Sequence, residues 1–341
     1  MLADVNALEP IAARYAAGGV YVLSDAALPR EGAYASVSEV LRRQGPVQEL
    51  RIEAGEAHKS PATLVRIWEW LLAGNATREA LLVCVGGGTL TDIGGFAAAT
   101  YKRGIRCLHV PTTLLAMVDA SIGGKTGINV GGIKNAAGAF YPPVETLLHT
   151  PFLDTLPHQE LLSGYGEMLK HALLDSEEHW HAVLRALEDG LPSASLILRS
   201  QAVKQRVVAA DPGEQGLRRV LNLGHTTAHA LEALRAQTGQ PMPHGYAVAY
   251  GLLTDLYLSH VLLGLDKSYI TRMTAVITEW YGRPSASCRD YDRLLRLMRQ
   301  DKKNTAAGIN FTLLRAVGQP ERDCYPSEEQ IREAVEYLFS I

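Results

Sequence analysis

Three histidines in the middle of the chain have a spacing that suits metal binding. His225 and His229 are four residues apart, and His244 follows a proline-containing turn at 241–243. Residues four apart on a helix lie on one face, one turn from each other. Neutral imidazole is the commonest metal ligand, so two of these histidines could share Zn²⁺ if a third protein ligand came from elsewhere. Taken singly, each histidine is also explained as a polar residue of a helix.

Glu167 offers a carboxylate for such a centre. It lies in an expected helix, three residues before Lys170. His244 could begin a further helix that faces the helix of His225. Zn²⁺ accepts carboxylate oxygens as well as imidazole nitrogens. The second half of the chain therefore contains a candidate metal centre.

Three consecutive glycines, Gly86, Gly87 and Gly88, follow the apolar stretch 80–85 and open an expected helix. Glycines let the backbone approach a ligand closely, and the free N–H groups of a helix start favour an anion such as a pyrophosphate. The spacing departs from the G-x-G-x-x-G dinucleotide fingerprint, because Thr91 stands where the third glycine would be. A purely structural turn is the alternative. The three glycines lie at the carboxyl end of an expected central strand, and this position favours ligand binding.

The segment after this turn is dense in charged groups. Arg103, Lys125 and Lys134 are interleaved with glycines, and Asp119 lies among them. Cations and flexible turns together can surround a phosphoryl group. A solvated basic loop explains the segment less well, because the formal net charge of the chain is −3. The segment predicts a phosphate-bearing substrate.

Composition excludes several classes of protein. A net charge of −3 gives no reason to expect nucleic acid or an anionic membrane as a partner. We find no apolar run of the roughly 18 residues that a spanning helix needs, and the N-terminus lacks the features of a signal peptide. The four cysteines have no paired spacing, and Cys84 and Cys107 lie in apolar runs, which indicates reduced thiols packed in cores. We expect a soluble cytoplasmic protein.

The pattern of elements predicts two domains, 1–150 and 151–341, for a chain of 341 residues. In the first, short apolar strands alternate with helices, which indicates a doubly wound, Rossmann-like parallel sheet. In the second, the periodicity is mostly helical, with one apolar stretch at 309–314 that suits a hairpin strand. The expected helices of the second domain are 158–174, 193–210, 224–238, 244–262 and 327–340.

The motifs and their order resemble the sugar phosphate cyclase family, and most closely its 3-dehydroquinate synthases. The resemblance runs from about residue 20 to 315 in consistent order, which makes it more specific than any single motif. The matching runs are 86–96, 99–104, 111–116, 118–129, 134–135, 138–141, 166–170, 211 with 214–218, 221–229, 244–245 and 301–303.

The resemblance implies a fold like that of dehydroquinate synthase and a lyase that needs NAD and a metal, Zn²⁺ or Co²⁺. The substrate would be 3-deoxy-D-arabino-heptulosonate 7-phosphate, a phosphorylated keto acid of the shikimate pathway to aromatic amino acids. The hydride removed from C5 permits loss of phosphate and then returns, so NAD is regenerated and the product is 3-dehydroquinate. A homodimer in the cytoplasm is also expected.

The family also implies roles for individual residues. The metal ligands would be Glu167, His225 and His244. Proton transfer would fall to Glu214 and His229, and contacts with substrate hydroxyls to Asp119, Lys170 and Asn222. The phosphate would be held by Arg103, Lys125, Asn135 and one of Lys302 or Lys303, with Lys134 close by, and the carboxylate by Lys204 and Arg218. The NAD positions would be Asp25, Glu56, Lys59, Gly86, Gly87, Gly88, Thr89, Asp92, Thr112 and Thr113.

Some residues depart from the family pattern. Tyr246 follows His244-Gly245 where a glutamate is usual, so we expect altered surroundings for the metal and no loss of it. The loop 130–133 differs in sequence at unchanged length, and the asparagine expected soon after Asp25 is missing.

Two alternatives to 3-dehydroquinate synthase remain. Another sugar phosphate cyclase, acting on glucose 6-phosphate or sedoheptulose 7-phosphate, would not need the cations Lys204 and Arg218, which suit a carboxylate. A metal-dependent alcohol or glycerol dehydrogenase of similar architecture would release NADH and would not need the cations between Arg103 and Lys134. A non-catalytic binding protein is least favoured, because the metal, phosphate and proton-transfer positions all hold competent residues.

Overall fold

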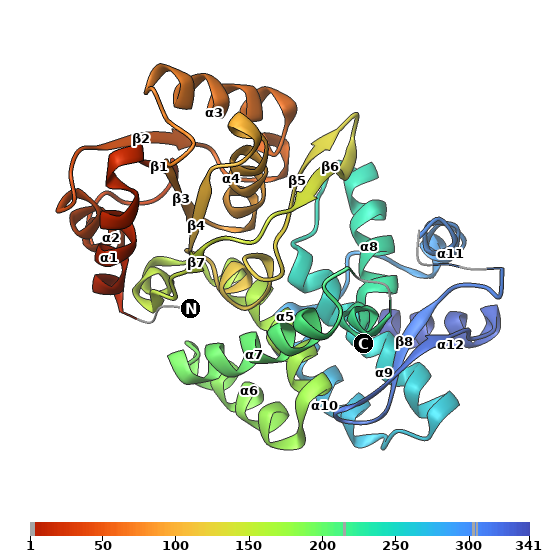
Figure 1. Ribbon diagram of the computed structural model, residues 1–341. Coiled ribbons are helices and arrows are strands. Elements are labelled where there is room, and N and C mark those ends of the chain that lie inside the picture. The colour runs from red at the N-terminus through yellow and green to blue at the C-terminus, as the bar shows by residue number, and fades with distance from the viewer. Residues whose placement is uncertain (1–3, 214–215, 302–303, 305) are drawn as a thin grey trace. The chain divides into compact units, whose positions relative to one another are not determined.

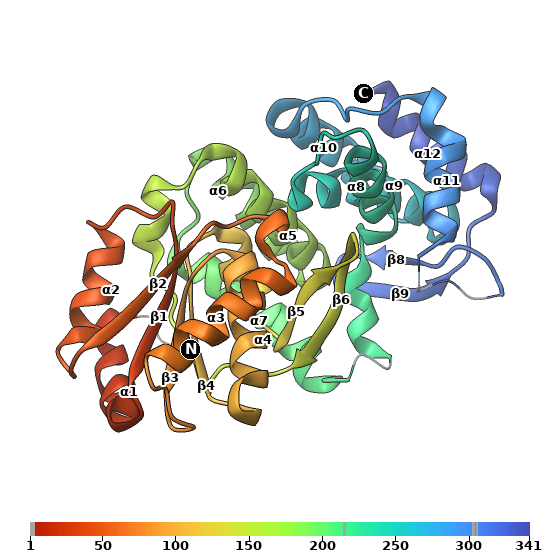
Figure 2. The ribbon, with the colours of Figure 1, turned by 90° about the horizontal axis from the view of Figure 1, so that it is seen from above.

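The computed structural model (Figures 1 and 2) describes residues 4–213, 216–301, 304 and 306–341. The chain divides into two compact units, Met1–Pro157 and His158–Ile341. The sequence predicts a boundary at residue 150. The helical turn η6 (Thr150–Thr155) belongs to the first unit, because it buries Phe152 and Leu153 and packs against α2 (Ala33–Arg42).

A five-stranded parallel sheet forms the centre of the first unit. Its elements are β1 (Val20–Asp25), β2 (Val47–Ile52), β3 (Leu81–Gly86), β4 (Arg106–Pro111), β7 (Glu145–Thr146), α1 (Leu8–Tyr15), α2, α3 (Pro61–Ala73) and α4 (Gly88–Thr100). The strand order is β2-β1-β3-β4-β7, and Figure 1 shows α3 and α4 on one side of the sheet and α1 and α2 on the other. Strand β3 is buried along its whole length because helices cover both faces. The predicted doubly wound α/β architecture is confirmed.

The core on the α3 and α4 side is apolar and continuous. It joins Leu64, Ile67 and Leu71 of α3 to Leu82 of β3 and Ile93 of α4. Shorter helical turns connect the main elements: η1 (Val5–Ala7), η2 (Ala16–Gly18), η3 (Glu56–His58), η4 (Tyr101–Arg103) and the π-helical turn η5 (Ala116–Ala120). Of these turns, η3 and η5 follow the carboxyl ends of β2 and β4, whereas Arg103 in η4 lies before the amino end of β4.

An antiparallel hairpin in the first unit was not predicted. It consists of β5 (Lys125–Val130) and β6 (Ile133–Phe140), joined by Gly131 and Gly132. Both glycines have positive φ, 60° and 80°, which suits the two-residue turns of hairpins. Most of β6 is exposed, so the segment lacks the apolar alternation that marks a strand in a sequence.

Helix α9 forms the centre of the second unit. The elements are α5 (His158–Asp175), α6 (Glu177–Asp189), α7 (Ala194–Ala210), η7 (Leu217–Asn222), α8 (His225–Gln237), α9 (His244–Leu263), α10 (Ser268–Val276), η8 (Ile277–Tyr281), η9 (Cys288–Asp290), α11 (Tyr291–Arg299), β8 (Phe311–Ala316), β9 (Gln319–Cys324) and α12 (Glu328–Ser340). Helices α5, α8 and α12 and strand β8 pack against α9. The five predicted helices are α5, α7, α8, α9 and α12, and β8 is the predicted hairpin strand. Its partner β9 was missed, because its sequence is polar and only pairing with β8 makes it a strand.

Helix α9 is long and apolar enough to cross a membrane by length and composition, and 67% of that stretch is buried inside the unit. The sequence prediction that no apolar run has spanning length therefore needs correction for this helix. Thr254, Asp255 and Ser259 interrupt the run, yet the mean hydropathy stays high. Its burial is that of the core helix of a helical domain.

Glycines allow the central helices to approach each other at backbone distance. A Cβ added to Gly245 of α9 would lie 1.8 Å from the carbonyl oxygen of Ser163 in α5, and one added to Gly166 would lie 2.2 Å from that of Gly245. A Cβ on Gly251 would lie 1.8 Å from the carbonyl oxygen of Gly224, which precedes α8. No larger residue fits at these positions without moving a helix.

We expect Gly251→Ala to lower the free energy of unfolding by at least about 1–3 kcal/mol, the usual cost of overpacking, because the methyl group meets backbone atoms that cannot rotate away. The control is Val261→Ala in the same helix, where the side chain is exposed and the expected change is within about 0.5 kcal/mol. Denaturant unfolding followed by circular dichroism measures both. Equal midpoints for the two variants would contradict the close helix contact.

Candidate metal centre and cofactor site

Three helices of the second unit bring one carboxylate and two imidazoles together. Glu167 comes from the middle of α5, and His225 and His244 are the first residues of α8 and α9. The Oε1 atom of Glu167 lies 3.4 Å from Nε2 of His225 and 3.2 Å from Nε2 of His244. All three ligand atoms lie within 4.8 Å of one another. This is the spacing of ligands that surround a single metal ion.

The remaining ring nitrogens have partners that orient the two imidazoles. Nδ1 of His225 lies 3.0 Å from the carbonyl oxygen of Leu223, and Nδ1 of His244 lies 3.4 Å from Oε2 of Glu232. A proton on each Nδ1 can be donated to these oxygens, which leaves each Nε2 lone pair directed at Glu167. Metal-binding histidines commonly have such a partner, and it fixes both the tautomer and the ring orientation.

Lys170 keeps the buried carboxylate of Glu167 ionised. Burial alone would raise the pKa of Glu167, but Nζ of Lys170 lies 2.5 Å from Oε2, and this charge together with both histidines holds that pKa well below its ordinary value. Burial and the charge of Lys170 lower the pKa of His225 to about 4, so its ring is neutral at pH 7. An ionised carboxylate and a neutral imidazole are the forms that bind metals.

Two residues that the sequence analysis missed position these ligands. Glu232 contacts the ring of His244, as described above. Asp255 of α9 is fully buried and accepts a hydrogen bond of 2.5 Å from the backbone N–H of Gly224, the residue before His225. Glu232 lies in the predicted helix of His225, seven residues after it, so helical periodicity could have identified it as a neighbour. Asp255 carries no such signal, because its role depends on how α8 packs against α9.

His229, predicted for proton transfer, lies one turn after His225. The two rings have centroids 5.5 Å apart, and Nδ1 of His229 lies 3.2 Å from Oδ2 of Asp301. Glu214, the other predicted proton-transfer residue, and Lys302 and Lys303 lie outside the described residues. Asn222 ends η7, two residues before the glycine that precedes α8.

The two predicted carboxylate-binding cations of the second unit are both buried. Lys204 is on α7, and Arg218 is in η7, which packs against α7. The guanidinium of Arg218 donates a 3.1 Å hydrogen bond to the carbonyl oxygen of Pro212, and its backbone N–H donates to Asp211. Burying two cations is costly unless each has compensating partners or a ligand.

In the first unit, the glycine turn lies at the point where the strand order reverses. Strand β1 has β2 on one side and β3 on the other, and ligands of open α/β sheets bind beside the carboxyl ends of strands at such a point. Gly86 ends β3, and Gly87 and Gly88 lead into α4. The backbone N–H of Thr112 donates to the carbonyl oxygen of Gly86, and a Cβ on Gly87 would lie 3.1 Å from Thr113. Asp25 ends the adjacent strand β1.

A buried lysine links the predicted NAD and phosphate residues of this unit. Nζ of Lys59 lies 2.5 Å from Oδ2 of Asp92 in α4 and 2.5 Å from Oδ1 of Asn135 in β6. Asn129, which we did not predict, donates to the carboxylate of Glu56 and accepts from the backbone N–H of Asn135. Thr89 lies in the first turn of α4, close in sequence to Asp92.

The other predicted phosphate residues are exposed cations of the first unit. Arg103 ends η4 with φ of 66°, Lys125 begins β5, and Lys134 lies on β6. Asp119, predicted to contact a substrate hydroxyl, is half-buried in η5. The structure thus groups the predicted residues in two sets, one in each unit.

Comparison with known proteins gives a consistent result along the chain. The family model for the N-terminal domain of 3-dehydroquinate synthase matches residues 49–163, and that for the C-terminal domain matches 164–304. A curated 3-dehydroquinate synthase from Parabacteroides distasonis is 45% identical over 291 residues, which are 84% of this chain and 82% of the relative.

Two solved structures have the same fold. The 2-epi-5-epi-valiolone synthase of Streptomyces hygroscopicus, with NAD⁺ and Zn²⁺ bound, matches with a TM-score of 0.84 and 24% identity, over 95% of this chain and 91% of that one. A 2-deoxy-scyllo-inosose synthase in complex with carbaglucose-6-phosphate, NAD⁺ and Co²⁺ matches with a TM-score of 0.81 and 23% identity, over 98% and 94% of the two chains.

We expect Glu232→Gln to weaken metal binding by about 10- to 100-fold, because the amide is a poorer acceptor for the ring N–H of His244 and that ring loses orientation. Titration of chelator-treated protein with Zn²⁺ against a competing indicator measures the affinity. Glu336→Gln, which changes an exposed carboxylate of α12, is the control and should leave the affinity unchanged. An unaltered affinity in Glu232→Gln would show that the carboxylate does not orient the ligand.

Proposed function

The chain belongs to the 3-dehydroquinate synthase family, and from this premise we propose how its residues convert 3-deoxy-D-arabino-heptulosonate 7-phosphate into 3-dehydroquinate and phosphate. The observation that carries the proposal is the set of buried Glu167 and half-buried His225 and His244 beside Lys170. A chain of this family with these ligands is a phosphate-eliminating, carbocycle-forming lyase of the shikimate pathway. NAD⁺ and Zn²⁺ or Co²⁺ are the cofactors we assign to it.

The residues of the second unit fit a divalent metal ion. Glu167 contributes one negative charge, and the Nε2 atoms of His225 and His244 both face it. Burial alone would lower the pKa of His244, but contacts with Glu167 and Glu232 raise it to about 10, so a bound metal ion takes the place of the proton on its Nε2 atom. When bound, such an ion lowers the pKa of a coordinated hydroxyl and polarises a carbonyl group. Lys170 keeps the carboxylate of Glu167 ionised, and Glu232 holds the ring of His244, so the chain supplies both the charge and the orientation of the ligand set.

The glycine turn after β3 suits the pyrophosphate of NAD⁺. The N–H groups at the start of α4 can donate to phosphate oxygens, and glycine permits the close approach. Asp25 at the end of β1 is placed to accept hydrogen bonds from a ribose, as acidic residues do at strand ends of dinucleotide-binding sheets. A hollow of about 380 Å³ lined by Ala26 and Ile52, at the carboxyl ends of β1 and β2, offers volume for the nucleoside. NAD⁺ supplies the hydride acceptor that this reaction needs.

The substrate has two anionic ends, a phosphate and a carboxylate, and we assign a separate group of residues to each. We assign the phosphate to Arg103, Lys125, Lys134 and Asn135, with one of Lys302 or Lys303, because the family places such residues around it. The carboxylate we assign to Lys204 and Arg218. Arginine presents a planar fork to two oxygens and lysine adds a point charge.

We assign hydroxyl contacts and proton transfer to polar residues that the family resemblance indicates. Asp301 orients His229 through Nδ1, which leaves Nε2 of His229 to exchange a proton with substrate. We assign Glu214 to the same task and Asp119, Lys170 and Asn222 to the substrate hydroxyls. A homodimer and a cytoplasmic location stay predictions.

We expect turnover to require NAD⁺ without net formation of NADH, because the hydride returns to the same substrate molecule. Phosphate release and absorbance from NADH are followed in one reaction with substoichiometric NAD⁺. Phosphate should exceed the NAD⁺ added by many turnovers while NADH does not accumulate. Growth of NADH in proportion to product would favour the alcohol or glycerol dehydrogenase alternative.

Arg218→Ala should depress turnover of the heptulosonate phosphate by at least about tenfold, since charge-assisted hydrogen bonds contribute about 1.5–3 kcal/mol each. Steady-state kinetics measures the effect, with metal content and unfolding midpoint determined in parallel because Arg218 is buried. Arg219→Ala is the matched control. The side chain of Arg219 is about half exposed, and its ion pair with the surface residue Asp323 is long, at 3.9 Å.

A second variant, Arg218→Lys, keeps the charge and removes the planar fork, so we expect partial recovery of turnover. If Arg218→Ala is folded, keeps its metal and turns over the keto acid phosphate as well as the parent does, the carboxylate is not bound there. A cyclase acting on a substrate without that group would then be the better assignment.

A further inference from the structure

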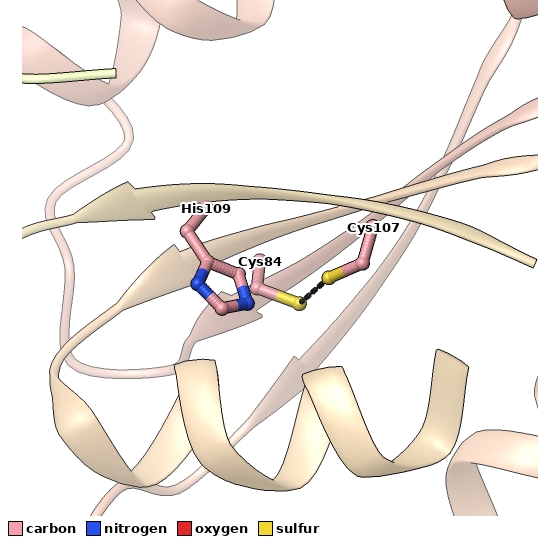
Figure 3. A group of neighbouring side chains, drawn as sticks. All are labelled: Cys84, Cys107 and His109. Carbon is pink, nitrogen blue, oxygen red and sulfur yellow. Dashed lines mark hydrogen bonds between the residues drawn. The ribbon is translucent and has the colours of Figure 1, made fainter. Parts of the chain in front are cut away.

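A second group of metal-binding side chains lies in the core of the first unit. Cys84 is on β3, and Cys107 and His109 are on the neighbouring strand β4. In the parallel register, Cys84 lies opposite His109 and Leu82 opposite Cys107, so the three side chains share one face of the sheet. Figure 3 shows them directed toward α4, with the two sulfur atoms side by side and a ring nitrogen of His109 beside Cys84. All three are at most 3% exposed.

The spacing of the three ligand atoms suits a single ion. The sulfur atoms are 3.7 Å apart, and the two sulfurs and a ring nitrogen all lie within 4.8 Å of one another. Two sulfurs 3.7 Å apart, each at the usual Zn–S distance of about 2.3 Å, subtend an angle of about 107° at the metal, close to tetrahedral. Two thiols in van der Waals contact have a similar separation, so the imidazole is the feature that distinguishes a metal site from packed cysteines.

No hydrogen bond of good geometry reaches either ring nitrogen of His109 among the described residues, although the buried ring lies beside Cys107 and the backbone of Ser121. A buried polar group without a partner costs free energy and calls for an explanation such as an ion that the group binds. Binding of a metal ion by one ring nitrogen would offset the free-energy cost of burying the imidazole.

Helix α4 contacts Cys84 and His109 through two glycines. A Cβ on Gly94 would lie 2.3 Å from the sulfur of Cys84, and one on Gly95 would lie 3.5 Å from Nε2 of His109. At these two glycines the backbone of α4 packs directly on Cys84 and His109, while Ile93 and Ala97 of the same helix belong to the apolar core that includes both cysteines.

We propose that Cys84, Cys107 and His109 form a second metal site, separate from Glu167, His225 and His244, that takes the thiophilic ion Zn²⁺. Thiolate ligands select Zn²⁺ and Cu⁺ over harder ions. Two thiolates and a neutral imidazole make a neutral site with Zn²⁺ but leave one negative charge with Cu⁺, and a net charge is costly in an apolar core. The ion would bind β3 to β4 two residues before Gly86, where the glycine turn begins.

Cobalt substitution tests the proposal, because only this site has sulfur ligands and only thiolates give charge-transfer absorption to Co²⁺ in the near ultraviolet. The full chain is stripped of metal, kept reduced with a phosphine and titrated with Co²⁺. The wild-type protein and Glu167→Ala should both show the band, and Cys107→Ser should lose it. The matched control is Cys288→Ser, which changes an exposed free cysteine and should keep the band.

Zinc counts by mass spectrometry of the metal give a second measurement. We expect about two ions per chain in the wild type and in Cys288→Ser, and about one in each of Cys107→Ser and Glu167→Ala. Circular dichroism establishes whether the variants are folded. If Cys107→Ser does not fold, His109→Gln, which loses only the nitrogen ligand, replaces it in both measurements.

Absence of the band in wild-type protein, or equal zinc counts in wild type and Cys107→Ser, overturns the proposal. Detection of a Cys84–Cys107 disulfide after hydrogen peroxide treatment of protein that never binds a second ion would also overturn it, in favour of a thiol pair that responds to oxidation.

Discussion

The candidate metal centre depends on helices that touch at their backbones. Each of its ligands is next to a glycine at such a contact: Glu167 follows Gly166, His225 follows Gly224, and His244 precedes Gly245. A side chain at any of these glycines would separate two helices, and one ligand would move away from the others. The two imidazoles and the carboxylate therefore meet because the neighbouring residues have no side chains. The close packing of α5, α8 and α9 thus determines the geometry of the ligands.

Electrostatics adds a second requirement to this packing. Glu167 is fully buried, and an ionised carboxylate in that position is stable only with charges and donors around it. Lys170 supplies the charge from the same helix, one turn away, and the rings of His225 and His244 contact the carboxylate from α8 and α9. The donors and acceptors thus come from all three helices that the glycines bring together. Hydrogen bonds hold the ends of the helices in place, since Asp255 accepts from Gly224 and Ser163 accepts from the N–H of Gly245.

Local patterns in the sequence predicted what local physics decides. The apolar run of β3 and the glycines after it predicted a buried strand and a turn at the sheet edge, and the spacing of His225 and His229 predicted a helix. Features that depend on contacts between distant parts of the sequence were missed, because no local pattern marks them. Strand β9 exists through pairing with β8, and Asp255 acts through the crossing of two helices. The loop 130–133 contains Gly131 and Gly132, which turn the hairpin of β5 and β6, but the exposed strand β6 gives no apolar alternation that would predict it. The roles given to Glu214, Lys302 and Lys303 rest on family resemblance alone.

His244 and Gly251 lie on the same helix, α9, and each must face a fixed direction. The number of residues between them is therefore fixed as well. Successive residues of an α-helix are turned by about 100° around the axis. Inserting or deleting one residue between His244 and Gly251 would thus swing the imidazole by that angle while Gly251 stayed against Gly224, or the reverse. Length changes in this stretch are forbidden even where every side chain could be replaced. Beyond Ser259, where α9 ends its buried stretch, the chain is free of this requirement, so natural insertions and engineered fusions in this unit should gather near Gly264 and spare the first two turns of the helix.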